Sequence, residues 1–321
     1  MNPRAIPLAA AVAVAVVLLP GCSAPAPVAT DSAVSVVKFE NCGVPVTFIR
    51  SPERVVTIKS TSTEMLLALG LGDRIVGTAF QDGPVPDEWA GDADPPVLSE
   101  FMPSEEAVLD LEPDLVYSGW ESAFAADAAG ERAELAALGV ATYVQPAACR
   151  SAQVPGKLDF AEIFRQIGEV ASIFGVDAAP LISDQQAALD AIVADDRGLT
   201  ALWYSSGTDT PYVGAGIGAP QLVLETIGLS NIAGDIDQTW SSLGWESIVE
   251  AVPDVIVLID ADWNTAQSKI DLLESNPATA RLSAVQNDAY LVIPFASSEA
   301  GVRTVSAAAS LSDQLKVLDL P

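Results

Sequence analysis

The chain has 321 residues, with 43 acidic and 15 basic side chains, three cysteines and no histidine. Half of it is apolar, so a large core can form, and its length suits about two domains of roughly 150 residues each. The formal net charge of −28 disfavours nucleic acid as a partner, because an acidic surface repels phosphates. Without histidine, Ser-His-Asp and Cys-His catalysis and histidine-ligated zinc, iron or haem are excluded, and three cysteines are too few for a zinc finger or an iron–sulfur cluster.

The N-terminus has the pattern of an export signal. Arg4 precedes an apolar run, residues 8–19, that is shorter than the roughly 20 residues a membrane-spanning helix needs. The run ends in Leu19-Pro20-Gly21-Cys22, which resembles a bacterial lipobox and implies a diacylated Cys22. We expect a lipoprotein signal peptide over residues 1–21, a flexible tether over 22–36 and a lipid anchor on the outer face of the cytoplasmic membrane. The alternative is an ordinary cleaved signal with a cysteine there by chance.

The other two cysteines form an even pair. In an oxidising compartment we expect Cys42 and Cys149, which are 107 residues apart, to form a disulfide. Two buried free thiols are the alternative.

Strands and helices alternate in the first half. Short β-branched runs predict strands and apolar residues at 3–4 spacing predict helices. In chain order these are a strand at 54–58, a helix at 61–71, strands at 74–79 and 113–117 with a helix at 104–111 between them, a helix at 125–138 and a strand at 141–144. The alternation predicts an α/β lobe over residues 37–157, with a parallel sheet covered on both faces.

The second half repeats this order. After a stretch at 158–196 that has helical spacing and almost no strand signal, a strand is predicted at 199–204, helices at 219–227 and 246–251, and a strand at 253–259. Glu106 and Glu246 each lie seven residues before a Pro-Asp pair that opens a strand. The sequence therefore predicts an α/β fold of two Rossmann-like lobes, 37–157 and 197–321, joined by a long helical linker at 158–196. The alternative is that Pro-Asp marks only a common helix-to-strand turn.

The combination of a lipoprotein signal, two α/β lobes and a helical linker resembles the class III substrate-binding proteins of ABC importers, the cobalamin and siderophore type. The resemblance rests on residues 54–56, on Leu-Gly-Leu-Gly-Asp-Arg-Ile-Val-Gly at 69–77 and on the two Glu-x6-Pro-Asp stretches. It implies a non-enzymatic, monomeric receptor that works with a permease and an ATPase and needs no cofactor. It also implies that Glu106 and Glu246 dock onto permease arginines. A carboxylate at the positive end of a helix is the alternative role for each.

Several short strings resemble one particular group within this family. The strings at 57–64, 118–122, 202–207, 212–221, 262–266 and 294–296 resemble an actinobacterial group proposed to bind F-420-0, the deazaflavin coenzyme F-420 without its glutamate tail. That resemblance implies F-420-0 as the transported ligand. The other ligands considered are an iron–siderophore and cobalamin.

Ligands of open α/β sheets bind beyond the carboxyl ends of the strands, where this chain has aromatic and small hydroxyl residues. Rings would stack on a flat ligand, hydroxyls would bind its polar chain, and Lys59 or Arg303 would bind its anions. The expected ligand-binding residues are Lys59, Ser60, Thr61, Phe80, Trp120, Glu121, Tyr204, Ser205, Trp240, Trp263, Asn264, Phe295 and Arg303. Arg150, beside Cys149, is a further cation. The alternatives are tryptophans that pack in the core and cations that pair with the many carboxylates.

The sequence contains no motif that indicates an enzyme. The glycines at 214, 216 and 218 lack the spacing of a dinucleotide-binding loop, and there is no phosphate-binding G-x4-G-K-[ST] motif. We predict no catalytic residues and no metal site. A secreted α/β enzyme is the remote alternative, since acidic pairs are abundant but form no pattern that points to a reaction.

Overall fold

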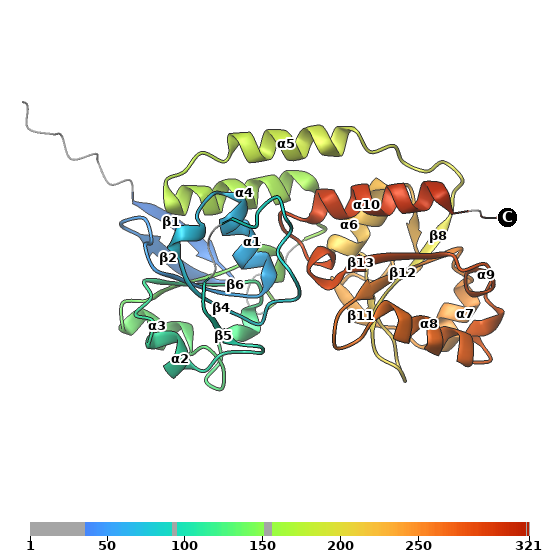
Figure 1. Cartoon of the computed structure of the whole chain (residues 1–321), viewed down its shortest axis with the longest axis horizontal. Coiled ribbons are helices and arrows are strands. Elements are labelled where there is room, and N and C mark those ends of the chain that lie inside the picture. The colour runs from blue at the N-terminus through green and yellow to red at the C-terminus, as the bar shows by residue number, and fades with distance from the viewer. Residues whose placement is uncertain (1–35, 92–94, 151–155, 319, 321) are drawn as a thin grey trace, which may run out of the picture. The chain divides into compact units, whose positions relative to one another are not determined.

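The computed structural model describes residues 36–91, 95–150, 156–318 and 320, and these residues belong to one compact unit. The unit contains two α/β lobes joined by a pair of helices (Figure 1). The predicted signal peptide, Cys22 and nearly all of the predicted tether lie outside the described residues.

The N-terminal lobe has a five-stranded parallel sheet with the order β5-β4-β3-β6-β7. A separate antiparallel hairpin of β1 and β2 precedes it. The elements are β1 (Val37–Asn41), β2 (Val44–Phe48), β3 (Val55–Ile58), α1 (Ser60–Ala68), η1 (Gly72–Arg74), β4 (Ile75–Ala79), β5 (Val97–Ser99), α2 (Glu105–Leu109), β6 (Leu115–Ser118), η2 (Glu121–Ala123), α3 (Arg132–Ala137), β7 (Ala141–Val144) and η3 (Pro146–Ala148).

The C-terminal lobe has a second sheet, in which β11-β9-β8-β12-β13 is the order and β10 also pairs with β8. Its elements are β8 (Thr200–Ser206), β9 (Tyr212–Gly214), α6 (Ala219–Thr226), β10 (Ser230–Asn231), β11 (Trp240–Ser242), α7 (Trp245–Ala251), β12 (Val255–Asp260), α8 (Ala266–Ser275), η4 (Thr279–Arg281), α9 (Ser283–Gln286), β13 (Tyr290–Pro294), η5 (Phe295–Ser298) and α10 (Thr304–Val317). The strand β9 runs antiparallel to both of its neighbours, β8 and β11. The expectation of a purely parallel sheet is therefore wrong for this lobe.

Both sheets are buried on both faces. Successive residues of a strand point to opposite sides of the sheet, and helices cover each side. In the N-terminal lobe, Leu115 packs in the cluster that includes α1 and α4, whereas Val116 packs in the cluster that includes α2 and α3. In the C-terminal lobe, Val257 faces α6 and α10, whereas Leu258 faces α7 and α8. Continuous apolar strands are what a doubly covered sheet requires.

Two helices connect the lobes, α4 (Phe160–Phe174) and α5 (Ala179–Asp190), as the helical spacing predicted (Figure 1). Gly175 ends α4 with a left-handed φ of 69°, a conformation that glycine adopts without a steric cost. The apolar face of α4 packs on the N-terminal lobe, and the Gln185 side chain of α5 donates to the Val302 carbonyl at 2.9 Å, just before α10. The connection therefore contacts both lobes, through α4 on one side and α5 on the other.

The Pro-Asp repeat has a structural cause in both lobes. The Asp114 carboxylate accepts a hydrogen bond from the Arg54 amide at 3.0 Å, and the Asp254 carboxylate accepts one from the Thr200 amide at 2.8 Å. Asp114 lies just before β6, and Asp254 lies just before β12. Each aspartate therefore caps the start of the neighbouring central strand, which is β3 in one lobe and β8 in the other. The equivalence confirms two lobes of one architecture.

One helix is much shorter than predicted. Residues 125–130 form turns, and α3 begins only at Arg132. Gly130 has a φ of 100°, outside the helical range, so the helix predicted at 125–138 is wrong over its first half.

Candidate functional site

An aromatic cavity of about 350 Å³ lies at the carboxyl ends of strands from both lobes. Its walls combine five aromatic rings with small hydroxyls and three charged side chains. They are formed by Trp120, Glu121, Ser122, Ala148, Arg150, Ser205, Ser206, Tyr212, Trp240, Trp263, Phe295 and Glu299. Trp120 follows β6 and Trp263 follows β12, so equivalent strand ends of the two lobes supply rings to one space. We call this space the aromatic cavity.

A smaller chamber of about 60 Å³ shares walls with the aromatic cavity, including Trp120, Arg150 and Glu299. Two of its polar atoms, Thr61 Oγ1 and Glu299 Oε2, are buried and have no hydrogen-bond partner among the described residues. Buried polar atoms are normally paired, so both are available to a ligand group or to water.

Lys59 is fully buried behind Trp120 and lies at the end of β3 with a left-handed φ of 78°. Its ammonium group pairs with the Asp82 carboxylate and lies 3.8 Å from the Trp120 ring centroid and 4.9 Å from that of Phe295. Strained backbone held by surrounding contacts is typical of functional sites. Because Phe295 belongs to the other lobe, Lys59 connects the two lobes beneath the aromatic cavity.

A second buried ion pair joins the lobes directly, since one partner belongs to each lobe. Arg303 Nε, at the start of α10, donates to Glu64 Oε2 of α1 at 2.6 Å, and Arg303 Nη2 donates to the Pro84 carbonyl at 2.9 Å. Burial raises the pKa of Glu64 above its ordinary value, although the guanidinium group opposes that shift. The lobes therefore meet through a desolvated charge pair, which is costly to break on one side only.

Glu299 bridges the lobes at the cavity wall. Its Oε1 accepts a hydrogen bond from Trp120 Nε1 at 2.5 Å. Burial raises the pKa of this carboxyl from 4.5 to about 7, while Lys59 acts in the opposite direction. The group therefore changes its charge near neutral pH, next to any ligand in the cavity.

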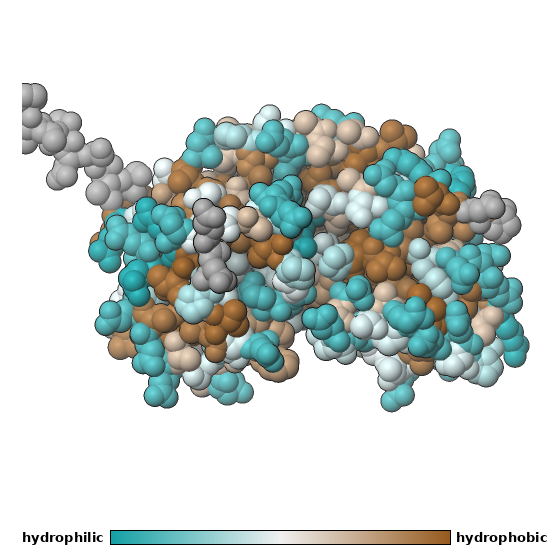
Figure 2. All heavy atoms as spheres, viewed as in Figure 1, coloured by the Kyte–Doolittle hydropathy of each residue, from teal (hydrophilic) through white to brown (hydrophobic). Residues whose placement is uncertain are grey.

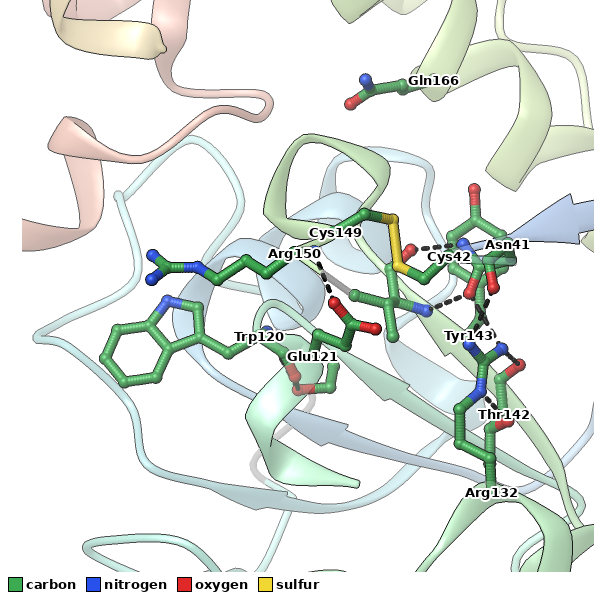
Figure 3. Close-up of a disulfide and its surroundings, with 12 residues drawn as sticks. Asn41, Cys42, Trp120, Glu121, Arg132, Thr142, Tyr143, Cys149, Arg150 and Gln166 are labelled. Carbon is green, nitrogen blue, oxygen red and sulfur yellow. Dashed lines mark hydrogen bonds between the residues drawn. A yellow bond between two sulfur atoms is a disulfide. The ribbon is translucent and has the colours of Figure 1, made fainter. Parts of the chain in front are cut away.

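The predicted disulfide between Cys42 and Cys149 is present, with a Cα–Cα distance of 5.1 Å. It joins the turn between β1 and β2 to the segment that leads into Arg150 (Figure 3). The Arg150 amide donates to Glu121 Oε2 at 2.5 Å, and its side chain extends past Trp120. The cross-link therefore fixes one wall of the aromatic cavity.

The predicted ligand-binding residues fall into two groups. Seven of them line a cavity: Thr61, Trp120, Glu121, Ser205, Trp240, Trp263 and Phe295. Six do not: Lys59, Ser60, Phe80, Tyr204, Asn264 and Arg303.

The second group supports the cavity walls or the core. The Phe80 ring packs edge-on against Trp120, with 5.4 Å between the centroids, and Ser60 accepts from the Asp82 amide. Tyr204 is buried, packs against Trp245 and donates to the Gly207 carbonyl. Asn264 accepts a hydrogen bond from Ser268. Direct contact of these side chains with ligand remains a prediction.

Sequence reasoning missed several contributors. Glu299 and Tyr212 line the aromatic cavity. Tyr212 opens the string at 212–221, which was given no role for it, and Glu299 lies beyond the string at 294–296. Lys269 of α8 is buried and donates to the Ile259 and Asn264 carbonyls, both at 2.6 Å, so it holds the turn that carries Trp263. Burial lowers the pKa of Lys269 to about 8. Helical spacing alone gave no signal that this lysine points inward.

The two glutamates expected to dock onto a permease occupy matching places. Glu106 lies in the first turn of α2 and Glu246 in the first turn of α7, and both are exposed. Each helix precedes the strand next to the central strand of its lobe. Docking itself remains a prediction.

The described residues contain no group of three or more acidic, cysteine or histidine side chains placed to hold a metal ion. Among them there is also no helix with the length and hydropathy needed to cross a bilayer. On the face shown in Figure 2, hydrophilic residues are spread over both lobes, with apolar patches between them.

Two α/β lobes, a helical connection and an aromatic cavity at their junction define a two-lobed solute-binding protein. The model of the family described as periplasmic binding protein matches residues 55–296, and the chain belongs to this family. No protein among those with curated functions matches the sequence.

Solved structures agree with this assignment. A periplasmic binding protein from Veillonella parvula superimposes with a TM-score of 0.76 at 25% identity, covering 87% of this chain and 97% of that one. An ABC-type Fe3+-hydroxamate transport system protein from Saccharomonospora viridis gives a TM-score of 0.73 at 26% identity, covering 86% and 98%. The heme-binding protein RhuT from Roseiflexus sp. is similar in fold, with a TM-score of 0.65 at 23% identity over 82% of this chain and 97% of that one.

Proposed function

We propose that this protein is the lipid-anchored, extracytoplasmic receptor of an ABC importer and that it binds a compact, flat aromatic ligand in the aromatic cavity. The observation that carries the proposal is the meeting of Trp120, Trp240 and Trp263 around one space at the lobe junction. A volume of about 350 Å³ falls within the range of small-molecule sites, roughly 300–1,000 Å³. Aromatic pairs contribute about 0.5–1.5 kcal/mol each beyond burial, so several rings favour a conjugated ligand.

F-420-0 is the first ligand to test. Its tricyclic ring suits the aromatic walls, and its ribityl chain suits hydroxyls such as Ser205 and Ser206. The support comes from the resemblance of the cavity-forming strings to the deazaflavin-binding group and from the ring content of the cavity.

A ferric hydroxamate is the second candidate. The supporting observation is the 26% identity to the Fe3+-hydroxamate transport system protein over nearly its whole length. A siderophore encloses its own iron, so the lack of a metal-binding cluster among the described residues does not count against it.

The importer partners follow from the family. A receptor of this kind delivers its ligand to a permease that is driven by a separate ATPase. We assign permease contact to Glu106 and Glu246, whose helices occupy equivalent places in the two lobes. No chemical step is assigned to this chain.

The test is a fluorescence titration of the purified protein with F-420-0 and with a ferric hydroxamate. Binding in the aromatic cavity should quench tryptophan emission, because three tryptophans line it. The substitution Ser206→Trp at the end of β8 fills the cavity and should abolish the quenching. The substitution Ser247→Trp, on the exposed side of α7, is the matched control and should bind like the wild type.

Binding that survives Ser206→Trp would contradict the cavity assignment. Tight binding of the ferric hydroxamate without binding of F-420-0 would select the second candidate and reject the first.

A further inference from the structure

We propose that Arg150 recognises an anionic group of the ligand and that the Cys42–Cys149 disulfide holds Arg150 at the cavity wall. This inference rests on the proposed function and names the chemical class of its ligand: a flat conjugated ring that carries a phosphate or carboxylate. The structure combines a guanidinium group without an ion-pair partner among the described residues, a ring-lined cavity and a cross-link next to both.

Two buried cations near the cavity are already paired. Lys59 is neutralised by Asp82, and Arg303 is neutralised by Glu64, with side chains that are almost fully buried. Neither residue lines the aromatic cavity or the small chamber. Both cations predicted from sequence as anion-binding groups therefore stabilise the lobe junction in this structure.

Arg150 differs from both. It lines the aromatic cavity and the small chamber, and its side chain is exposed. Among the described residues, no carboxylate lies within ion-pair distance of its guanidinium group. A planar guanidinium group with free N–H donors is the side chain best suited to bind a phosphate or carboxylate through two parallel hydrogen bonds.

The backbone that leads into Arg150 is anchored through Cys149. Cys149 is bonded to Cys42 of the β1–β2 turn, and the neighbouring Asn41 donates to the Val144 carbonyl of β7 at 2.7 Å. The Arg132 guanidinium donates to the Asn41 carbonyl at 2.7 Å (Figure 3). The hairpin is thus clamped to the sheet, and the disulfide transmits this rigidity to Arg150.

Two acidic side chains share the cavity. The Glu121 carboxylate accepts from the Arg150 amide, while the Arg150 side chain extends away from it toward Trp120 (Figure 3). Glu299 lies at the wall on the same side as Trp120, and its Oε1 is bonded to the indole. Glu121 therefore orients the backbone of Arg150 and leaves the guanidinium group available to an anion.

The test uses two probes that share one tricyclic ring, riboflavin, which is neutral, and flavin mononucleotide, which adds a phosphate. Charge-assisted hydrogen bonds to Arg150 should make the wild type bind flavin mononucleotide at least about tenfold more tightly than riboflavin. Arg150→Gln should remove this preference and leave riboflavin affinity unchanged. Arg165→Gln removes an exposed guanidinium group of α4 outside both cavities and should keep the preference.

Equal affinity of the wild type for the two flavins, or a phosphate preference that survives Arg150→Gln, would overturn the inference. The affinity for riboflavin, which has no phosphate, tests the aromatic ligand site independently of Arg150. Riboflavin binding that Ser206→Trp abolishes supports an aromatic ligand site whatever Arg150 does. A wild type that binds neither flavin overturns the inference about Arg150, while the proposed function is decided by the titration with F-420-0 and a ferric hydroxamate.

Discussion

Glu299 combines a place in the cavity wall, a contact between the lobes and a raised pKa. It touches Trp120 of the opposite lobe and lines both cavities. One of its oxygens is buried without a partner among the described residues. A carboxyl in this position is held in its neutral form by burial, since ionising it would place a charge where water cannot reach it.

We predict a pH dependence of stability that belongs to Glu299. The pKa of its carboxyl is raised from 4.5 to about 7, so between these values the folded protein holds a proton that the unfolded chain has released. The free energy of unfolding should therefore fall as pH rises through this window, by an amount of the order of 1 kcal/mol per pH unit.

Urea unfolding of wild type and Glu299→Gln at pH 5, 6, 7 and 8 measures this effect. The stability difference between the two proteins should change across the window, because the variant has no proton to lose. The exposed Glu250→Gln on α7 serves as the control and should track the wild type. A Glu299→Gln curve parallel to that of the wild type would rule out the assignment.

The burial of Lys59 and Arg303 in ion pairs could not be predicted from the sequence. Both were expected at the ligand site because few cations are available in so acidic a chain. Their carboxylate partners lie 23 and 239 residues away, a relation that no local pattern encodes. Trp120 and Trp263 reach the cavity as expected, because the end of an apolar strand is visible in sequence and fixes where the next side chain emerges.

At the scale of elements, β7 was predictable from its apolar run, whereas the short antiparallel strands β9 and β11 were not. The strand at 141–144 was predicted with the bounds of β7, since its buried residues form a continuous run before Gln145. The strands β9 and β11 have three residues each and lie at the antiparallel edge, so they have neither the length nor the pattern of a buried strand. Their position matters, because Tyr212 and Trp240 belong to them and line the cavity.

The disulfide is the element-level feature with the largest expected effect on stability. It closes a loop with a sequence separation of 107 residues. We predict that Cys42→Ser with Cys149→Ser lowers the free energy of unfolding by about 4–5 kcal/mol, because the unfolded chain regains the entropy that the cross-link removed.

Urea unfolding followed by tryptophan fluorescence tests this prediction. Adding reductant to the unfolding buffer should destabilise the wild type to the level of the double variant and leave the variant unchanged. A loss below about 1 kcal/mol would mean that the β1–β2 hairpin is held by its hydrogen bonds to β7 alone.

At the scale of the whole molecule, the two lobes repeat one architecture, and the repeat could be identified from sequence through its Pro-Asp pairs. Asp114 and Asp254 cap equivalent central strands, which is why the motif recurs. What the sequence could not supply was the packing of one lobe against the other. That packing depends on pairs such as Glu64 with Arg303, which become neighbours only in the folded protein.

Permease docking gives a prediction at this scale. Reversing the charge of both exposed glutamates, with Glu106→Lys and Glu246→Lys, should abolish uptake while ligand affinity of the purified protein stays unchanged. The two changes lie on the helices α2 and α7, and neither residue lines the aromatic cavity. Uptake of labelled ligand by cells that carry the permease and ATPase is the measurement.

The matched control reverses two other exposed acids at the same helices, with Asp110→Lys and Glu250→Lys. It changes net charge equally and should leave uptake intact. Equal uptake by both double variants would exclude a special role for Glu106 and Glu246.

A crystal structure of the protein purified with its natural ligand tests the central claim most directly. The account predicts a single small molecule between the lobes, with its ring system against Trp120 and Trp263 and its anionic group on Arg150. A ligand bound outside the aromatic cavity, with only solvent between the lobes, would contradict it.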